Sequence, residues 1–133
     1  MTMTPLHIYL QEITDTCALI ERLFNAPAQD ATIHPELLAH FSPEFSMLTT
    51  GGHRLDHTAL ADFFSAMAGR KQGLKIDVSD LALLYESERG AVVTYAETQT
   101  LNSEVEVRLA TVLLDRRQDG ALQWRHLQET TRG

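Results

Sequence analysis

The strongest constraint on the fold is a change in the hydrophobic pattern near Leu74. From this residue onward, segments rich in Val, Leu, Thr and aromatic residues alternate with short turn-forming segments. The predicted strands span residues 74–86, 91–101, 104–115 and 121–130. The turns between them cover residues 87–90, 102–103 and 119–120. Four consecutive strands joined by tight turns predict an antiparallel meander.

A long helix is predicted at the start of the chain. Thr4 can cap it and Pro5 suits its first position, and Asn25-Ala26-Pro27 end it. Its apolar positions recur every three or four residues, at Leu6, Leu10, Ile13, Cys17, Ile20 and Phe24. Cys17 lies on this apolar stripe, so we expect a buried, inert thiol.

A second group of elements precedes the meander. A short helix is predicted after Pro35, with Leu37, Leu38 and Phe41 facing inward, and a short strand over 44–48 ends at Gly51-Gly52. Asp56 can cap a second long helix that Gly69 ends. Its apolar positions are Leu60, Phe63, Phe64 and Met67. Helices segregated ahead of an antiparallel sheet indicate the α+β class, in a single domain over 1–133.

Composition excludes several kinds of partner. The 133 residues include 11 basic and 18 acidic residues, a net charge of −7, which argues against binding nucleic acid. The N-terminal segment does not have the pattern of a signal peptide, and no run of 18 apolar residues occurs. We therefore expect a cytoplasmic protein with no membrane partner. Its single cysteine excludes an internal disulfide.

The turn at Asn102-Ser103 predicts which side chains share a face of the sheet. A two-residue turn there pairs Glu97 with Arg108 and Tyr95 with Ala110. Directly opposed residues lie on the same face, so these four side chains should lie together. The register places Glu97 and Arg108 as a cross-strand ion pair, and Arg108 would lower the pKa of a neighbouring carboxyl.

A two-residue turn at Asp119-Gly120 extends this assignment to the last strand. It pairs Ala110 with Glu129, which adds a second carboxylate to the face of Glu97. It places Trp124 and His126 on the opposite face. A loop of three or five residues would reverse these faces.

The six histidines invite a test for a metal site. His53 and His57 lie near Asp56 and Asp62, and His34 and His40 lie on either side of Pro35. The chain contains no His-Glu-x-x-His motif and no paired cysteines. We therefore expect no metal and no cofactor.

The order of these elements resembles the nuclear-transport-factor-2-like superfamily, and in particular its SnoaL-like and calcium/calmodulin-kinase association-domain-like branches. The resemblance covers nearly the whole chain, and its local features are the segment from Phe45 to Phe64 and the closing Trp124-Arg-His-Leu-Gln-Glu-Thr130. It implies a strongly bent sheet that wraps around the helices as a cone with an internal pocket. It also implies a small apolar or amphipathic ligand and a homodimer formed through the outer sheet face.

The resemblance carries over no catalytic residue. Gln128 stands where a second His is common, and the Tyr-plus-two-Asp arrangement of ketosteroid isomerase has no match here. Three functions follow as hypotheses: a small-molecule-binding domain, a small enzyme of the dehydratase, isomerase, cyclase or hydrolase type, or a structural homodimeric module. For catalysis the candidates are Glu97 and His126.

Two tiers of residues are predicted to bind the ligand. The first tier is Tyr95, Glu97, Arg108 and Glu129, because pockets combine apolar walls with a few polar groups. The second tier is Trp124, His126, Phe24, Phe45, Met47, Phe63 and Met67. The ion pair could equally serve the sheet alone, and the second-tier residues could equally be ordinary core.

Overall fold

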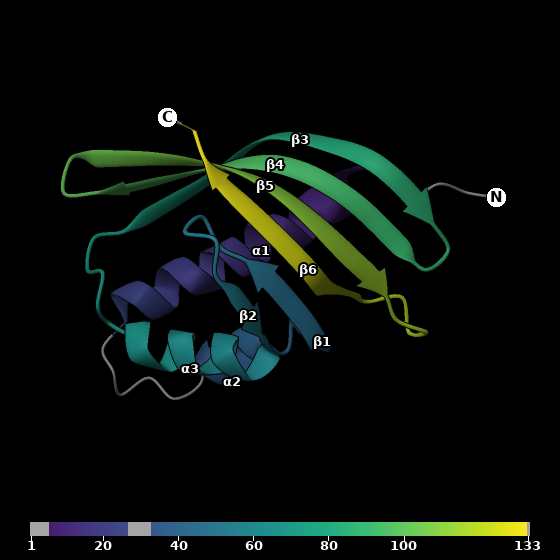
Figure 1. Ribbon diagram of the computed structural model, residues 1–133, viewed down its shortest axis with the longest axis horizontal. Coiled ribbons are helices and arrows are strands. Elements are labelled where there is room, and N and C mark those ends of the chain that lie inside the picture. The colour runs from purple at the N-terminus through teal and green to yellow at the C-terminus, as the bar shows by residue number, and fades with distance from the viewer. Residues whose placement is uncertain (1–5, 27–32, 133) are drawn as a thin grey trace.

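A six-stranded sheet forms the frame of the molecule, and the helices lie on one side of it (Figure 1). The computed structural model describes residues 6–26 and 33–132. The helices are α1 (Leu6–Asn25), α2 (Ile33–Leu38) and α3 (His57–Met67). The strands are β1 (Phe41–Leu48), β2 (Arg54–Asp56), β3 (Lys75–Ser87), β4 (Gly90–Leu101), β5 (Glu104–Arg116) and β6 (Leu122–Thr131).

The predicted meander is present, and the structure adds two strands to it. The strand order is β2-β1-β6-β5-β4-β3, in which β3 to β6 are the four predicted strands. The predicted strand over 44–48 is the second half of β1, which pairs in parallel with β6. Strand β2, which has only three residues, was not predicted. The sheet is therefore mixed but mainly antiparallel, and the fold is of the predicted α+β class.

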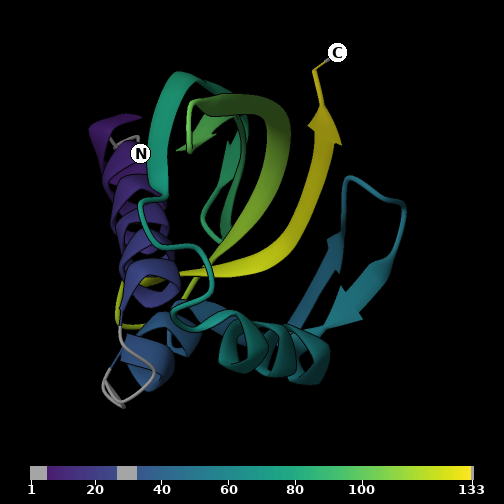
Figure 2. The ribbon, with the colours of Figure 1, turned by 90° about the vertical axis from the view of Figure 1, so that its left-hand side faces the viewer.

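The sheet curls around the helices rather than lying flat (Figure 2). Register shifts interrupt the pairing of β3 with β4 at Ser79/Ala82 and at Leu83/Tyr85. Asp80, inside the first of these shifts, has a φ of 56°. Bulges of this kind bend a strand and increase its twist. The concave side thus created receives α1 and faces α3.

The buried stripe of α1 differs in part from the predicted one. Ile13, Cys17 and Phe24 are buried as predicted, whereas Leu6 and Leu10 are exposed. Tyr9 takes the inward position instead, and its hydroxyl donates to Glu86 and accepts from Arg116. Leu10 lies about 100° around the helix from Tyr9, so it turns toward solvent. Thr4 and Pro5 lie outside the described residues.

The other two helices close the open side of the sheet. Helix α2 begins at Ile33, before Pro35 rather than after it, and proline is tolerated in a first helical turn. Asp56 caps α3 as predicted, with its carboxylate accepting from Ala59 N at 2.8 Å. Leu60 and Phe64 are buried, whereas Met67 is only half-buried.

One carboxylate links α1 to the strands. Oε2 of Glu12 accepts hydrogen bonds from Thr16 Oγ1 at 2.9 Å and from Trp124 Nε1 at 3.2 Å. His40 Nδ1 lies 2.6 Å from the same oxygen. The Trp124 backbone N–H also donates to the His40 carbonyl at 2.8 Å. Glu12 therefore joins α1, the start of β1 and β6 through an acceptor whose side chain is only 14% exposed.

We expect Glu12→Gln to lower the free energy of unfolding by about 2–3 kcal/mol, because it leaves buried donors poorly paired. The loss should be larger at pH 6 than at pH 8.5. The hydrogen bond to Glu12 raises the pKa of His40, against the opposing effect of burial. The stabilisation from the pair of Glu12 with protonated His40 is complete below about pH 6.5. It disappears as the pH rises through the raised pKa of His40. Urea unfolding at both pH values measures this, and equal losses would contradict it. Glu104→Gln, an exposed matched change, should be neutral.

Candidate functional site

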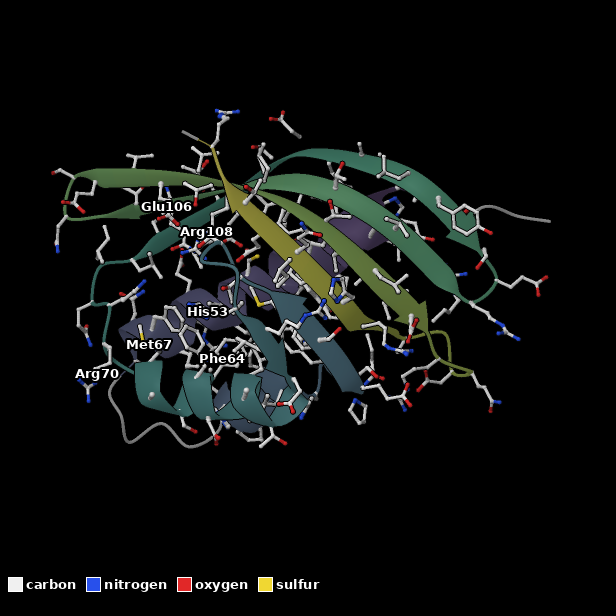
Figure 3. All side chains as sticks on the ribbon, in the orientation of Figure 1. His53, Phe64, Met67, Arg70, Glu106 and Arg108 are labelled. Carbon is white, nitrogen blue, oxygen red and sulfur yellow. The ribbon has the colours of Figure 1, made fainter. Side chains whose placement is uncertain are left out.

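A pocket of about 410 Å³ lies between the concave face of the sheet, α1, α3 and the β1–β2 hairpin. This volume is within the usual range for small-molecule sites, about 300–1,000 Å³. Figure 3 shows Glu106 and Arg108 projecting from the sheet toward the side where His53 and Phe64 lie. The predicted apolar residues that line the pocket are Phe24, Phe45, Met47, Phe63 and Trp124.

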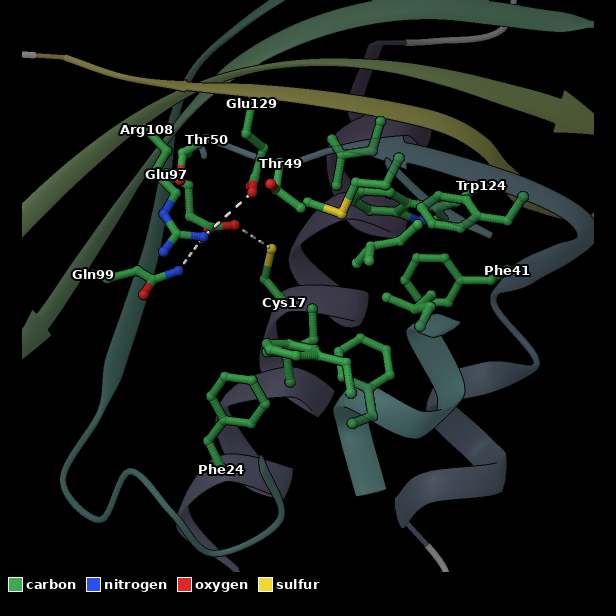
Figure 4. A pocket seen from close by; sticks show the side chains of 18 of the residues that line it. Cys17, Phe24, Phe41, Thr49, Thr50, Glu97, Gln99, Arg108, Trp124 and Glu129 are labelled. Atoms are coloured by element: carbon green, nitrogen blue, oxygen red, sulfur yellow. Dashed lines mark hydrogen bonds and ion pairs between the residues drawn. The ribbon is translucent and has the colours of Figure 1, made fainter. Parts of the chain in front are cut away.

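The polar groups gather at one end of this pocket (Figure 4). Arg108 Nη1 donates to Glu129 Oε1 at 3.3 Å, and Arg108 Nε donates to Glu106. Glu97 accepts from Gln99 Nε2 at 2.5 Å and from Cys17 Sγ at 3.6 Å. Glu97 and Glu129 are only 5% and 7% exposed. Two buried carboxylates therefore share a site with one guanidinium.

The register predicted for β4 and β5 is confirmed. Glu97 pairs with Arg108, and Tyr95 pairs with Ala110. Ala110 in turn pairs with Glu129 of the neighbouring strand β6. Asn102 and Ser103 have φ values of 51° and 70°, as a two-residue hairpin turn with both central residues left-handed requires. The four first-tier residues, including Tyr95, all line the pocket.

The predicted ion pair between Glu97 and Arg108 is wrong. Among the residues that the structure describes, Arg108 forms its ion pairs with Glu106 and Glu129. Opposition in the ladder fixes the backbone and the face, but the long side chains choose among all neighbours on that face. Glu97 turns toward α1, where Cys17 meets it.

The prediction that Trp124 and His126 both lie on the face opposite to Glu97 is wrong for Trp124. The loop between β5 and β6 spans residues 117–121, because Arg116 pairs with Leu122. A register shift between Leu113 and Leu114 then restores the predicted pairing from His126 onward. Trp124 consequently turns into the pocket, while His126 lies on the other face with Nδ1 2.7 Å from Ser46 Oγ.

Other residues enter or leave the predicted site. Met67 packs against the core but does not line the pocket. The residues missed by the sequence analysis include Cys17, Gln99 and Ile20. Gln99 could have been found, since it is two residues from Glu97 on the same strand face. Cys17 and Ile20 were recognised only as the apolar stripe of a helix, which gave no sign of an adjoining pocket.

The described part of the chain shows no metal site. No group of three His, Cys, Asp or Glu side chains there is placed to hold an ion. His34 Nε2 lies 3.0 Å from the Ala61 carbonyl instead. His53 lines the pocket, whereas His57 does not.

Solved structures place the chain in a family. An NTF2-like protein of unknown function from Pseudomonas aeruginosa is 38% identical, with a TM-score of 0.89, over 94% of this chain and 98% of that one. The chain belongs to the NTF2-like family. No family model matches the sequence, and no curated protein matches it either.

More distant neighbours show the same fold. A protein of unknown function with a cystatin-like fold from Nostoc punctiforme has a TM-score of 0.73 and 15% identity, over 99% of this chain and 96% of that one. A ketosteroid isomerase-like protein from Erwinia carotovora atroseptica has a TM-score of 0.60 and 16% identity, over 93% of this chain and 96% of that one.

The described helices include none that is long and apolar enough to cross a membrane.

Burial dominates the electrostatics of this NTF2-like pocket. It raises the pKa of Glu129 from 4.5 to about 7, helped by the charge of Glu97 and opposed by Arg108. The predicted lowering of a carboxyl pKa by Arg108 is therefore outweighed by burial at Glu129. Burial, together with nearby acids, also raises the pKa values of the Cys17 thiol and the Tyr95 phenol. Both groups stay protonated near neutral pH and can donate hydrogen bonds.

We expect Glu129→Gln to flatten the pH dependence of stability. The folded state keeps the Glu129 proton up to about pH 7, whereas the unfolded state loses it near 4.5. Stability from this group therefore declines across that window, by about 3 kcal/mol in total. Urea unfolding at pH 5 and pH 8 measures the decline. Glu104→Gln should keep the parent's slope, and an unchanged slope in Glu129→Gln would contradict the expectation.

Proposed function

We propose that this protein binds a small amphipathic molecule in the NTF2-like pocket. The observation that carries the proposal is the division of the pocket into two ends (Figure 4). Glu97, Gln99, Arg108 and Glu129 lie at one end, and most of the remaining lining is apolar, with aromatic rings among aliphatic side chains. Binding sites typically combine an apolar wall with a few convergent polar groups in this way.

The aromatic rings form a continuous wall rather than isolated contacts. Phe41 is within 6 Å of both Phe64 and Trp124, with ring centroids 5.9 and 5.5 Å apart. The Trp124 ring in turn meets Tyr95 edge-on at 6.4 Å. Ring pairs of this kind hold one another in place. A ligand therefore meets a wall that is already ordered before binding.

The pocket entrance also has an apolar surface. Phe63 is 44% exposed and lines the pocket, and its ring meets Phe24 at 6.2 Å. Lys71 Nζ lies 5.7 Å from the centroid of the Phe24 ring. An exposed phenylalanine at an opening is costly to leave in water, and an amphipathic ligand would cover it.

We expect Ile20→Trp to block binding, because Ile20 lines the pocket and an indole would occupy its volume. The parent should bind the neutral fluorescent probe N-phenyl-1-naphthylamine, and Ile20→Trp should weaken that binding at least ten-fold in a fluorescence titration. The matched control is Ile8→Trp, on the exposed side of the same helix. Equal affinity in the parent and both variants would place the probe elsewhere and contradict the proposal.

A second candidate function is acid–base catalysis, and the state of Glu129 favours it. A buried carboxyl whose pKa is about 7 can both donate and accept a proton at neutral pH. The Erwinia neighbour is described as ketosteroid isomerase-like, which makes isomerisation of a cyclic ketone the first reaction to assay.

If the protein is such an enzyme, Glu129→Gln should lower kcat at least 100-fold, because the proton acceptor is lost. His126→Ala should keep the parent rate within two-fold, since His126 lies outside the pocket. A panel of cyclic enone and ketone substrates followed by absorbance provides the measurement. An active Glu129→Gln variant would remove Glu129 from this role.

A further inference from the structure

The polar end of the pocket has an unusual balance of charge. Arg108 forms ion pairs with Glu106 and Glu129, and Glu97 lies directly opposite Arg108 in the ladder of β4 with β5. Glu106 is largely exposed, with 45% of its side chain accessible, so water can screen it. Glu97 and Glu129 are buried and do not have that screening.

The hydrogen-bond partners of Glu97 do not supply the missing charge. Cys17 and Gln99 are neutral donors, at 3.6 and 2.5 Å. A buried carboxylate normally requires a cationic partner because its desolvation costs several kcal/mol. The single guanidinium at this end is already bound to Glu129 and Glu106.

No other cation of the pocket lining compensates for this deficit. Lys71 lies over the Phe24 ring, and neither it nor His53 contributes to the ion pairs of Glu97 or Glu129 among the described residues. Tyr95 and Cys17 keep their protons and remain neutral. When Glu97 and Glu129 are both ionised, these two buried carboxylates exceed the single guanidinium by one negative charge.

We propose that the ligand carries a protonated amine, which the carboxylates of Glu97 and Glu129 bind, and an apolar or aromatic body, which the ring-lined wall receives. This inference rests on the proposed ligand-binding function and specifies the chemical class of the ligand. An ammonium group supplies the absent charge and donates hydrogen bonds to both carboxylates. The aromatic rings nearby also favour a cation over an anion.

Other head groups fit the pocket less well. A carboxylate ligand would meet three acidic side chains and compete with them for one arginine. An alcohol could hydrogen-bond to Glu97 or Glu129 but would leave the charge deficit unchanged. The net charge of −7 adds a long-range attraction for cations.

Amine binding should also displace a proton. In the free pocket Glu129 is partly protonated near pH 7, because burial and Glu97 disfavour its charge. An adjacent ammonium favours the ionised form, so binding at pH 7 should release a fraction of a proton, about one half. Calorimetry in phosphate and in Tris buffer should therefore give different heats for an amine and equal heats for an alcohol.

The decisive experiment compares three compounds with one body and different heads: 4-phenylbutylamine, 4-phenyl-1-butanol and 4-phenylbutyrate. Each is titrated calorimetrically at pH 7, and displacement of N-phenyl-1-naphthylamine shows that it occupies the pocket. We expect the amine to bind at least ten-fold tighter than the alcohol and the carboxylate to bind weakest. Glu97→Gln and Glu129→Gln should each weaken the amine at least ten-fold and should weaken the alcohol less, because the glutamine amide oxygen can still accept the hydrogen bond of an alcohol. Glu104→Gln should change neither affinity.

The outcomes separate the inference from the function on which it rests. If the alcohol or the carboxylate binds as tightly as the amine, the amine inference is overturned and the ligand-binding function stands. If none of the three displaces the probe and Ile20→Trp also has no effect on the probe, the proposed function fails and the inference fails with it. Retained alcohol binding in the two glutamine variants shows that they are folded.

Discussion

The pairing of β4 with β5 determines the character of the pocket. A two-residue turn at Asn102-Ser103 leaves one possible register, and a shift by a single residue would move every side chain to the other face. In the observed register Glu97 and Arg108 point inward, and Ala110 leaves room beside the Tyr95 ring. The curvature of the sheet then converts a shared face into a common space, because bulged strands wrap around α1.

This arrangement has an energetic cost that other interactions offset. Keeping Glu97 and Glu129 away from water opposes folding, and the raised pKa of Glu129 is a direct expression of that cost. Folding is favoured by the aromatic core and by the hydrogen bond from Trp124 to Glu12. Trp124 belongs to both systems, since its N–H secures α1 and its ring lines the pocket. The wall of the pocket is therefore held by the same contacts that hold the fold.

The sequence predicted the elements that depend on local chemistry. Turn residues and strand composition gave β3 to β6, and an aspartate followed by a helical pattern gave the start of α3. The two-residue turn at Asn102-Ser103 also gave the face shared by Tyr95, Glu97 and Arg108. Glu129 lies on that face although the predicted turn at Asp119-Gly120 was wrong, because the longer loop and the bulge offset each other. The sequence did not predict the parallel pairing of β1 with β6, which joins segments about 80 residues apart and has no local signature.

The errors within the site have a common cause. The face of Trp124 depends on a five-residue loop and a bulge, neither of which is apparent from composition. The loop shifts the register by one residue, and the bulge shifts it back from His126 onward. The partner of Arg108 depends on which of three acids its long side chain reaches in three dimensions. Helix α1 brought Cys17 to Glu97 across a sequence separation of 80 residues. Turn chemistry could thus predict the face of the sheet, whereas the hydrogen-bond partners depended on how the helix packs against it.

A purely structural role for the charged cluster fits its position poorly. An ion pair that serves only the sheet has its lowest desolvation cost on a solvent-facing surface, where both partners remain hydrated. Replacing buried charges by apolar side chains is often neutral or stabilising. Here two buried acids line an NTF2-like pocket. Arg108 pairs with Glu129, whereas Glu97 has a thiol and an amide as its hydrogen-bond partners. That combination opposes stability on its own, and the amine ligand proposed above would supply the positive charge that it lacks.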